Sequence, residues 1–97
     1  MNDVERMAKE DRERSLKLMT EQEYYSLPYY GRWYLDWMAR WKPKTCQRLK
    51  EQGQLVEWFD RKGNEISEIL EDNYETLGMS GGMELVREMY LGEPEVD

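Results

Sequence analysis

The stretch from Tyr24 to Trp41 restricts the fold of this chain more than any other part of it. It reads YYSLPYYGRWYLDWMARW and holds eight of the twelve aromatic residues in the 97-residue chain. Because aromatic side chains bury roughly 150–250 Å² each, few other residues can compete as the centre of a core. At helical spacing, its apolar residues form one stripe: Tyr30, Trp33, Tyr34, Trp37, Met38 and Trp41. We therefore expect a central helix whose three Trp lie in the core and whose other face is in water: Arg32, Asp36, Ala39 and Arg40.

Residues that begin or end helices divide the rest of the chain. Thr20 and Glu23 predict a capping box, and Pro43 ends the central helix and suits the first turn of the next. The expected helices cover residues 3–18, 21–27, 30–41, 44–52, 55–62, 65–77 and 83–90. Gly53, Gly63 and Gly78 are expected to end helices, Asn64 to be an N-cap, and Ser80-Gly81-Gly82 to form a loop. The helix over 65–77 is expected to bury Ile66, Ile69, Leu70, Tyr74 and Leu77. Since no segment alternates with a period of two, we expect an all-α fold, a small compact bundle of about five to seven short helices around the Trp/Tyr-rich helix.

Length and composition predict a single domain over 1–97. Charged residues make up 36% of the chain, but the aromatic content of 12% is too high for a disordered chain. Residues 1–19 are expected to form a loosely attached helical arm, because their apolar stripe is thin, and 93–97 a disordered tail. No apolar run reaches the ~18 residues of a membrane span, and the first residues do not resemble a signal peptide. With Cys46 as the single cysteine, a cytoplasmic location is expected.

The residue types present argue against catalysis. The chain has no histidine, which is the commonest general base and transition-metal ligand. Cys46 is expected to be a buried thiol beside Leu49 without a base to activate it. Ser80-Gly81-Gly82 lacks the Lys-Ser/Thr pair that follows the glycines of a phosphate-binding loop. We expect no enzyme activity, no metal and no cofactor.

The net charge of −7 is unevenly distributed along the chain. Residues 1–27 carry five bases and seven acids, residues 28–50 six bases and one acid, and residues 51–97 three bases and thirteen acids. The net charges of these segments are therefore −2, +5 and −10. Such asymmetry indicates charged partners and says little about the fold.

Several of the residues that end helices or fill the expected core also share a spacing pattern. They lie between about residues 20 and 60: Tyr30-Gly31-Arg32, Trp37-Met38, Lys42-Pro43, Leu49 and Gly53-Gln54-Leu55. This pattern resembles the TnpV family of small proteins encoded in bacterial transposons and other mobile elements. The chain departs from the family at Trp33-Tyr34, where the family tends to be basic, and at Lys42, where it tends to have Arg. The resemblance brings no catalytic residues with it, and implies residence on a mobile element with a role in transposition, replication or defence evasion.

Two surfaces are candidates for binding a protein partner. The first is an acidic face: Glu57, Glu65, Glu68, Glu71, Asp72 and Glu75. Within the expected helix over 65–77, these carboxylates recur about every 4 Å, close to the ~3.4 Å phosphate spacing of one DNA strand. The second is an aromatic edge around Pro28, where tyrosines are favoured as contact residues: Tyr24, Tyr25 and Tyr29.

We therefore expect a non-catalytic, acidic mobile-element protein that binds a basic nucleic-acid-handling protein. Inhibition of a CRISPR-type defence nuclease by DNA mimicry, in the manner of anti-CRISPR proteins, is the form of this function that the acidic face favours. The alternative is a transposon accessory protein that binds DNA directly through the basic aromatic segment 29–50, with these candidate contacts: Arg32, Arg40, Lys44 and Arg48. A helix-turn-helix around Gly53 would support that alternative, although its second helix carries as many acids as bases. A homo-oligomer that uses the aromatic face remains a third possibility.

Overall fold

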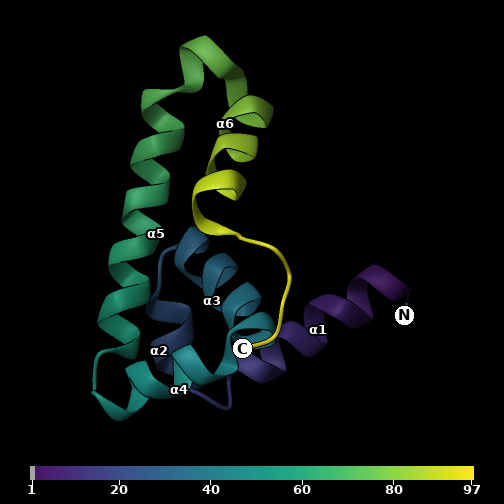
Figure 1. Ribbon diagram of the computed structural model, residues 1–97, viewed down its shortest axis with the longest axis vertical. Coiled ribbons are helices and arrows are strands. Elements are labelled where there is room, and N and C mark those ends of the chain that lie inside the picture. Colours follow the sequence, from purple (N-terminus) through teal and green to yellow (C-terminus); the bar gives the residue numbers. More distant parts are fainter. Residues whose placement is uncertain (1) are drawn as a thin grey trace.

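The structure, a computed structural model, describes residues 2–97, which form six helices and no strand (Figure 1). In chain order the helices are α1 (Asp3–Ser15), α2 (Glu21–Ser26), α3 (Tyr29–Trp41), α4 (Pro43–Glu51), α5 (Leu55–Asp72) and α6 (Tyr74–Tyr90). The expected all-α fold is confirmed.

The helices are arranged around α3, which lies at the centre of the molecule (Figure 1). The long α5 packs along one side of α3, and α1 packs against another. α6 turns back and runs beside the second half of α5, while α4 lies across the opposite end (Figure 1). The first half of α1 projects away from the body, so residues 2–10 are exposed.

The local signals around α2 and α4 are confirmed. The hydroxyl of Thr20 accepts a hydrogen bond from the Glu23 backbone N–H at 3.1 Å, and the Glu23 carboxylate accepts one from the Thr20 N–H at 2.9 Å, which is the expected capping box. Pro43 is the first residue of α4, where its missing N–H costs nothing. Gly53 joins α4 to α5 with a φ of 70°, a conformation that other residues rarely adopt.

The buried face of α3 differs from the expected stripe. The buried residues of this helix are Gly31, Tyr34, Leu35, Met38 and Ala39. Trp33, Trp37 and Trp41 are only partly buried; Trp33 and Trp37 pack against the buried cluster, so these side chains border the core and do not form its centre as expected. The physical reason is that α3 packs against α5 and α1 at once, and the small side chains of Gly31 and Ala39 let neighbours approach closely. Large indoles cannot occupy the line of closest approach, and they flank it instead.

α5 runs without interruption through Gly63, where the sequence predicts the end of one helix and Asn64 the start of another. Gly63 is buried against α3. Its lack of a side chain allows the two helices to approach closely, and it does not mark a turn. Phe59 and Ile66, one turn to either side of Gly63, are fully buried. The two expected helices over 55–62 and 65–77 are therefore one helix that ends at Asp72.

The last helix also differs from expectation. The chain turns at Asn73, and α6 contains a kink at Gly78, whose φ of 69° is outside the helical region. The expected loop at Ser80-Gly81-Gly82 is helical, and Gly82 is buried against Leu70 of α5. Because α5 ends before them, Tyr74 and Leu77 are 60% and 47% exposed and do not join the core as predicted.

After α6 the chain passes back over the body to the junction of α3 and α4 (Figure 1). The expected disordered tail, 93–97, has no secondary structure, but the structure places its last residue in specific contacts. The Asp97 carboxylate accepts hydrogen bonds from the backbone N–H groups of Lys44 and Thr45, at 3.0 and 3.2 Å, and from the Thr45 hydroxyl at 2.7 Å. It therefore caps the start of α4, which has no side-chain cap of its own.

Candidate functional site

The acidic face lies mainly on the outer side of α5, and most of its members are available to a partner. Five of its six carboxylates are exposed: Glu57, Glu68, Glu71, Asp72 and Glu75. None of the five is in an ion pair with a base among residues 2–97. Their charge is therefore compensated mainly by solvent and ions, and it can act on an approaching partner.

Glu65 differs from the other members of this face. Its carboxylate lies 3.2 Å from the Lys62 ammonium and accepts a hydrogen bond at 3.2 Å from the hydroxyl of Tyr90 in α6. Desolvation, with the nearby Glu65 charge, raises the pKa of Tyr90, which keeps that hydroxyl protonated as the donor. Glu65 thus helps to fasten α6 to α5, and it is not a free contact residue.

The expected single row of carboxylates is broken by the turn at Asn73. Glu75 belongs to α6, so it does not continue the spacing of the carboxylates on α5. Arg61 lines the same shallow hollow on α5 as Glu57 and Glu68, and its positive charge interrupts the negative charge there. What remains concentrated is the group around the end of α5, which we call the acidic junction: Glu68, Glu71, Asp72 and Glu75.

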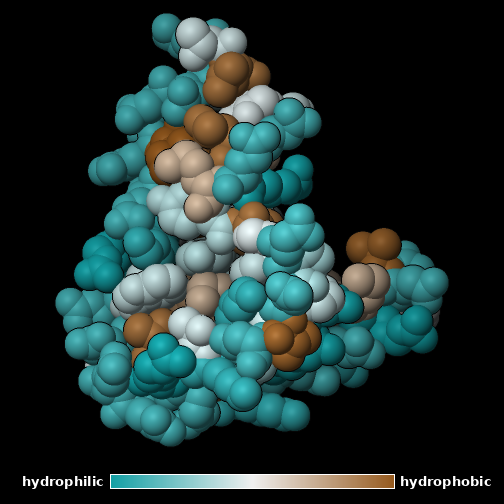
Figure 2. Space-filling view, viewed as in Figure 1, coloured by the Kyte–Doolittle hydropathy of each residue, from teal (hydrophilic) through white to brown (hydrophobic). Residues whose placement is uncertain are grey.

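A groove between α5 and α6 opens beside the acidic junction, next to the turn that joins the two helices. Its volume is about 500 Å³ and its lining residues are Tyr30, Ser67, Leu70, Glu71, Asp72, Tyr74, Glu75 and Met79. Figure 2 shows apolar residues gathered where α5 and α6 meet, while hydrophilic residues cover the outer edge of α5. Sequence reasoning missed this groove because it assigned Tyr30 and Tyr74 to the core, and the deciding feature, the turn at Asn73, has only a weak sequence signal.

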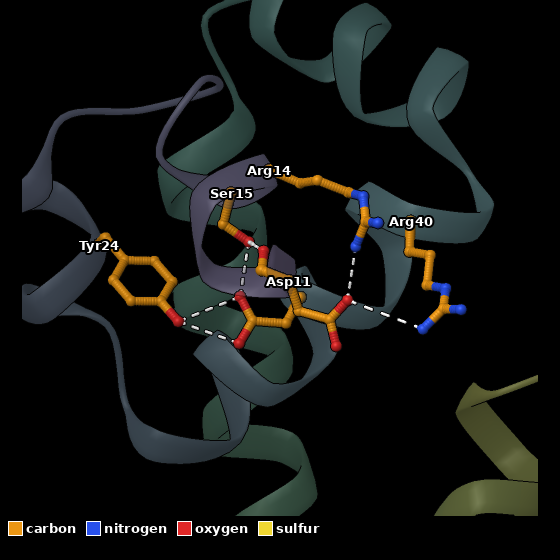
Figure 3. A network of polar contacts seen from close by, with 6 residues as sticks. Asp11, Arg14, Ser15, Tyr24 and Arg40 are labelled. Carbon is orange, nitrogen blue, oxygen red and sulfur yellow. Dashed lines mark hydrogen bonds and ion pairs between the residues drawn. The ribbon is translucent and has the colours of Figure 1, made fainter. Parts of the chain in front are cut away.

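Tyr24, one of the three tyrosines predicted to form an exposed edge, is buried with only 4% of its surface exposed. Its hydroxyl donates to the Asp36 carboxylate, 3.0 Å from each oxygen, and the Ser15 hydroxyl donates to the same carboxylate at 2.6 Å. Figure 3 shows Ser15 and Tyr24 pointing toward one another from α1 and α2, with the carboxylate of α3 between them. Tyr24 therefore belongs to a polar network that joins three helices, and the prediction that it lies on an exposed edge is wrong.

Burial also perturbs Asp36, which the sequence placed on the water-facing side of its helix. Desolvation raises the pKa of Asp36, while the hydrogen bonds from Ser15 and Tyr24 act in the opposite direction. The neighbouring Asp11 raises it further, and Asp11 itself pairs with Arg14 at 2.7 Å (Figure 3). The network holds α1 and α2 against α3, so its observed contacts are structural.

Tyr25 and Tyr29 remain exposed, by 50% and 65%. The Arg32 guanidinium lies 5.8 Å from the centre of the Tyr25 ring, and Tyr29 packs edge-to-face on Tyr30 with ring centroids 5.0 Å apart. Because Tyr30 also lines the groove, Tyr29 extends the aromatic surface next to the groove.

The four basic residues proposed for DNA binding do not form one free surface. Arg40 lies over the Trp41 ring at 5.0 Å and 3.9 Å from the Asp11 carboxylate, and Arg32 stacks on Tyr25. Lys44 and Arg48 are exposed on α4 and have no ion pair within the described residues. Only these two of the four are unengaged.

The remaining reactive group, the Cys46 thiol, is fully buried, as predicted. Burial, with the nearby Asp97 charge, raises the pKa of Cys46 to about 12, so the thiol stays protonated at neutral pH. Across residues 2–97, no three Asp, Glu or Cys side chains come together in a way that could hold a metal ion. Within the same range, no helix is both long and apolar enough to cross a bilayer.

Comparisons of the chain with protein-family models, curated proteins and solved structures find no match. The geometry of the described residues is therefore the basis for a functional assignment.

Proposed function

We propose that this protein is a non-catalytic, mobile-element protein that binds a basic nucleic-acid-handling protein through the acidic junction. The observation that carries the proposal is the group of exposed carboxylates around the end of α5, which has no ion-pair partner in the described chain. Leaving four like charges together costs free energy unless an oppositely charged surface covers them. A partner with clustered Lys and Arg supplies that surface.

Long-range electrostatics supports the same class of partner. Residues 51–97 carry a net charge of −10, and four of their thirteen acids form the acidic junction at the end of α5. A field of this sign steers basic proteins toward the acidic junction and accelerates association at low salt. Proteins that handle nucleic acids present such basic surfaces, because they must neutralise phosphates.

The form of the function we propose is competition with nucleic acid for that basic surface, as a DNA-mimicking inhibitor of a CRISPR-type defence nuclease would compete. The support for this is the clustering of carboxylates together with the resemblance to a mobile-element family over residues 20–60. The turn at Asn73 limits the mimicry to the acidic junction and removes a continuous phosphate-like row.

Capture from an extract of the native host tests the proposal. The wild-type protein, the Glu68→Lys/Asp72→Lys variant and a matched Glu84→Lys/Glu88→Lys variant on exposed positions of α6 serve as baits. We expect the wild type and the α6 variant to capture the same basic nucleic-acid-binding protein, and the acidic-junction variant to lose it. Duplex DNA added as a competitor should release it. Equal capture by all three baits, or a captured protein that binds no nucleic acid, would refute the proposal.

Direct DNA binding is the second candidate, favoured by the exposure of Lys44 and Arg48 on α4. One contact reduces its appeal. The Asp97 carboxylate already accepts hydrogen bonds from the backbone N–H groups at the start of α4. These groups are therefore not free to donate to a phosphate. A mobility-shift assay at low salt with single- and double-stranded DNA tests this candidate. A shift that is lost in the Lys44→Gln/Arg48→Gln variant would support direct DNA binding. The absence of any shift would eliminate it.

A further inference from the structure

We infer that the groove between α5 and α6 is a docking site for an arginine side chain and the apolar residue beside it, presented by a helix of the basic partner. This inference rests on the proposed function for the identity of the partner. It adds to that function the position of the contact on this protein and the type of side chain that binds there, which the distribution of charge alone does not give.

The walls of the groove are apolar and aromatic. Tyr30 of α3, Leu70 of α5, and Tyr74 and Met79 of α6 converge on it. Tyr74 and Met79 are 60% and 52% exposed, and Leu77 beside them is 47% exposed. Large apolar side chains gathered at the surface of a small protein mark contact sites, because leaving them in water is unfavourable.

Acidic side chains from both α5 and α6 line the rim of the groove. Glu71, Asp72 and Glu75 line it together with the Ser67 hydroxyl, and no Lys or Arg contributes to the lining. Four oxygen-bearing side chains without a base present acceptors for several N–H donors. An occupant must therefore carry positive charge and several donors, and it must also have an apolar body to cover the walls.

Arginine satisfies these requirements better than lysine. The planar guanidinium stacks on aromatic rings and donates in a fork that matches a carboxylate, whereas the lysine ammonium is a strongly hydrated point charge. The tyrosines supply rings and the acidic junction supplies carboxylates on the same side of the molecule. At about 500 Å³ the groove lies in the range of sites that enclose a small molecule, so one long side chain leaves room for an apolar neighbour.

The geometry of α6 suits the groove to a helix. Residues of α5 and residues of α6 on both sides of the kink at Gly78 line the groove, so it has two helical walls and is open to solvent. A helix laid along such walls places side chains four residues apart on the same face. One of them would be the arginine at the acidic junction, and the other the apolar residue against Met79.

The test uses fluorescein-labelled helical peptides that present Arg and Leu four residues apart, and matched peptides in which citrulline or Lys replaces Arg. Citrulline keeps the shape of arginine but not its charge. By fluorescence anisotropy at low salt, we expect the wild-type protein to bind the Arg peptide about tenfold more tightly than the citrulline peptide, and more tightly than the Lys peptide. Equal binding of the Arg and citrulline peptides would overturn the inference.

Variants of the protein locate the contact. We expect Tyr74→Ser to weaken binding of the Arg peptide several-fold, and Met89→Ser, at a similarly exposed apolar side chain of α6 outside the groove, to leave it unchanged. With methionine methyl groups labelled for NMR, the signal of Met79 should shift on titration while that of Met7, exposed on α1, should not. Equal effects of the Tyr74→Ser and Met89→Ser changes, or an unmoved Met79 signal, would overturn the site.

A last pair of variants separates this inference from the proposed function. Glu71→Gln/Asp72→Asn/Glu75→Gln neutralises the rim, and Glu51→Gln/Glu84→Gln/Glu88→Gln removes the same charge elsewhere. If both lose the peptide equally, the attraction is diffuse, and the groove is overturned while the proposed function stands. If only the rim variant loses the peptide, the groove is supported even if the captured host protein proves not to handle nucleic acid. Self-association abolished by Tyr74→Ser would replace the partner by a second copy of the chain.

Discussion

The backbone of Gly63 in α5 lies directly against the backbone of Gly31 in α3. A Cβ atom added to Gly63 would lie 2.6 Å from the Gly31 nitrogen and 2.8 Å from its Cα, and one added to Gly31 would lie 2.7 Å from the Phe59 carbonyl oxygen. Neither position can accept a methyl group unless the helices move apart. The packing of α5 on α3, and with it the position of the acidic junction, therefore depends on two glycines that face each other.

We predict that Gly63→Ala destabilises the protein by at least about 2 kcal/mol, because the added methyl meets backbone atoms that cannot rotate away. An ordinary glycine inside a helix behaves in the opposite way, since replacement by Ala stabilises by roughly 0.5–1 kcal/mol. Urea unfolding measures the difference. The control is Gly92→Ala, where nothing lies within 4 Å of the added atom, and the expected change is within about 0.5 kcal/mol. A stabilised Gly63→Ala protein would show that the helices are not in contact there.

The polar network of α1, α2 and α3 gives a second prediction. Tyr24→Phe removes the hydroxyl that donates to Asp36 and should lower the free energy of unfolding by about 1.5–3 kcal/mol, the usual range for a hydrogen bond to a charged group. Tyr25→Phe is the matched control, because the Tyr25 ring is half exposed and its hydroxyl makes no hydrogen bond within the described residues. Equal effects of the two changes would argue against the network.

The pH dependence of stability tests the burial of Asp36. Its pKa is raised on folding, chiefly by desolvation, so the folded state binds the proton more tightly than the unfolded state. The stabilisation from this proton is complete below the unfolded pKa of about 3.9 and is lost as the pH rises through the folded value. The unfolding free energy of the wild type should therefore fall with rising pH relative to that of Asp36→Asn, which cannot titrate.

Comparison of these two proteins by urea unfolding between about pH 4 and pH 7 isolates that effect. Hydrogen bonds from the Thr20 backbone and side chain lower the pKa of Glu23 and give the opposite slope, but this contribution is common to both proteins and cancels. A difference that stays flat, or that rises with pH, would contradict the assignment of Asp36 as a desolvated carboxyl.

The Cys46 thiol offers a test of the core. Because it is fully buried and burial raises its pKa to about 12, alkylation of the native protein at neutral pH should be at least about 100-fold slower than that of the urea-unfolded protein. Mass spectrometry over time follows the reaction. Rapid native alkylation would show that the region between α3, α4 and the tail opens readily.

The helix boundaries that depend on local chemistry could be predicted from the sequence. The capping box at Thr20, the start of α4 at Pro43 and the left-handed Gly53 each follow from the covalent structure of a few neighbouring residues. The burial of Cys46 also followed from its position on its helix.

The features that depend on tertiary contact could not be predicted in the same way. Gly63 has the same local signal whether it ends a helix or allows another backbone to approach, and only the presence of Gly31 opposite it decides between the two. The burial of Tyr24 likewise requires the carboxylate of Asp36, twelve residues away. The groove requires the turn at Asn73, which the apolar spacing of 65–77 obscures. Each of these features depends on contacts that local sequence signals do not reveal.

The central claim, that the acidic junction binds a basic partner, is tested most directly by the salt dependence of affinity for the protein captured from the host. The dissociation constant is measured from roughly 50 to roughly 200 mM salt, a range over which screening of exposed charges becomes strong. The variants are Glu68→Gln/Glu71→Gln/Asp72→Asn/Glu75→Gln and a control with the same loss of charge, Glu51→Gln/Glu84→Gln/Glu88→Gln/Glu93→Gln. We predict weaker binding and a shallower salt dependence for the acidic-junction variant than for the control. Identical affinities and identical slopes for the two variants would contradict the claim.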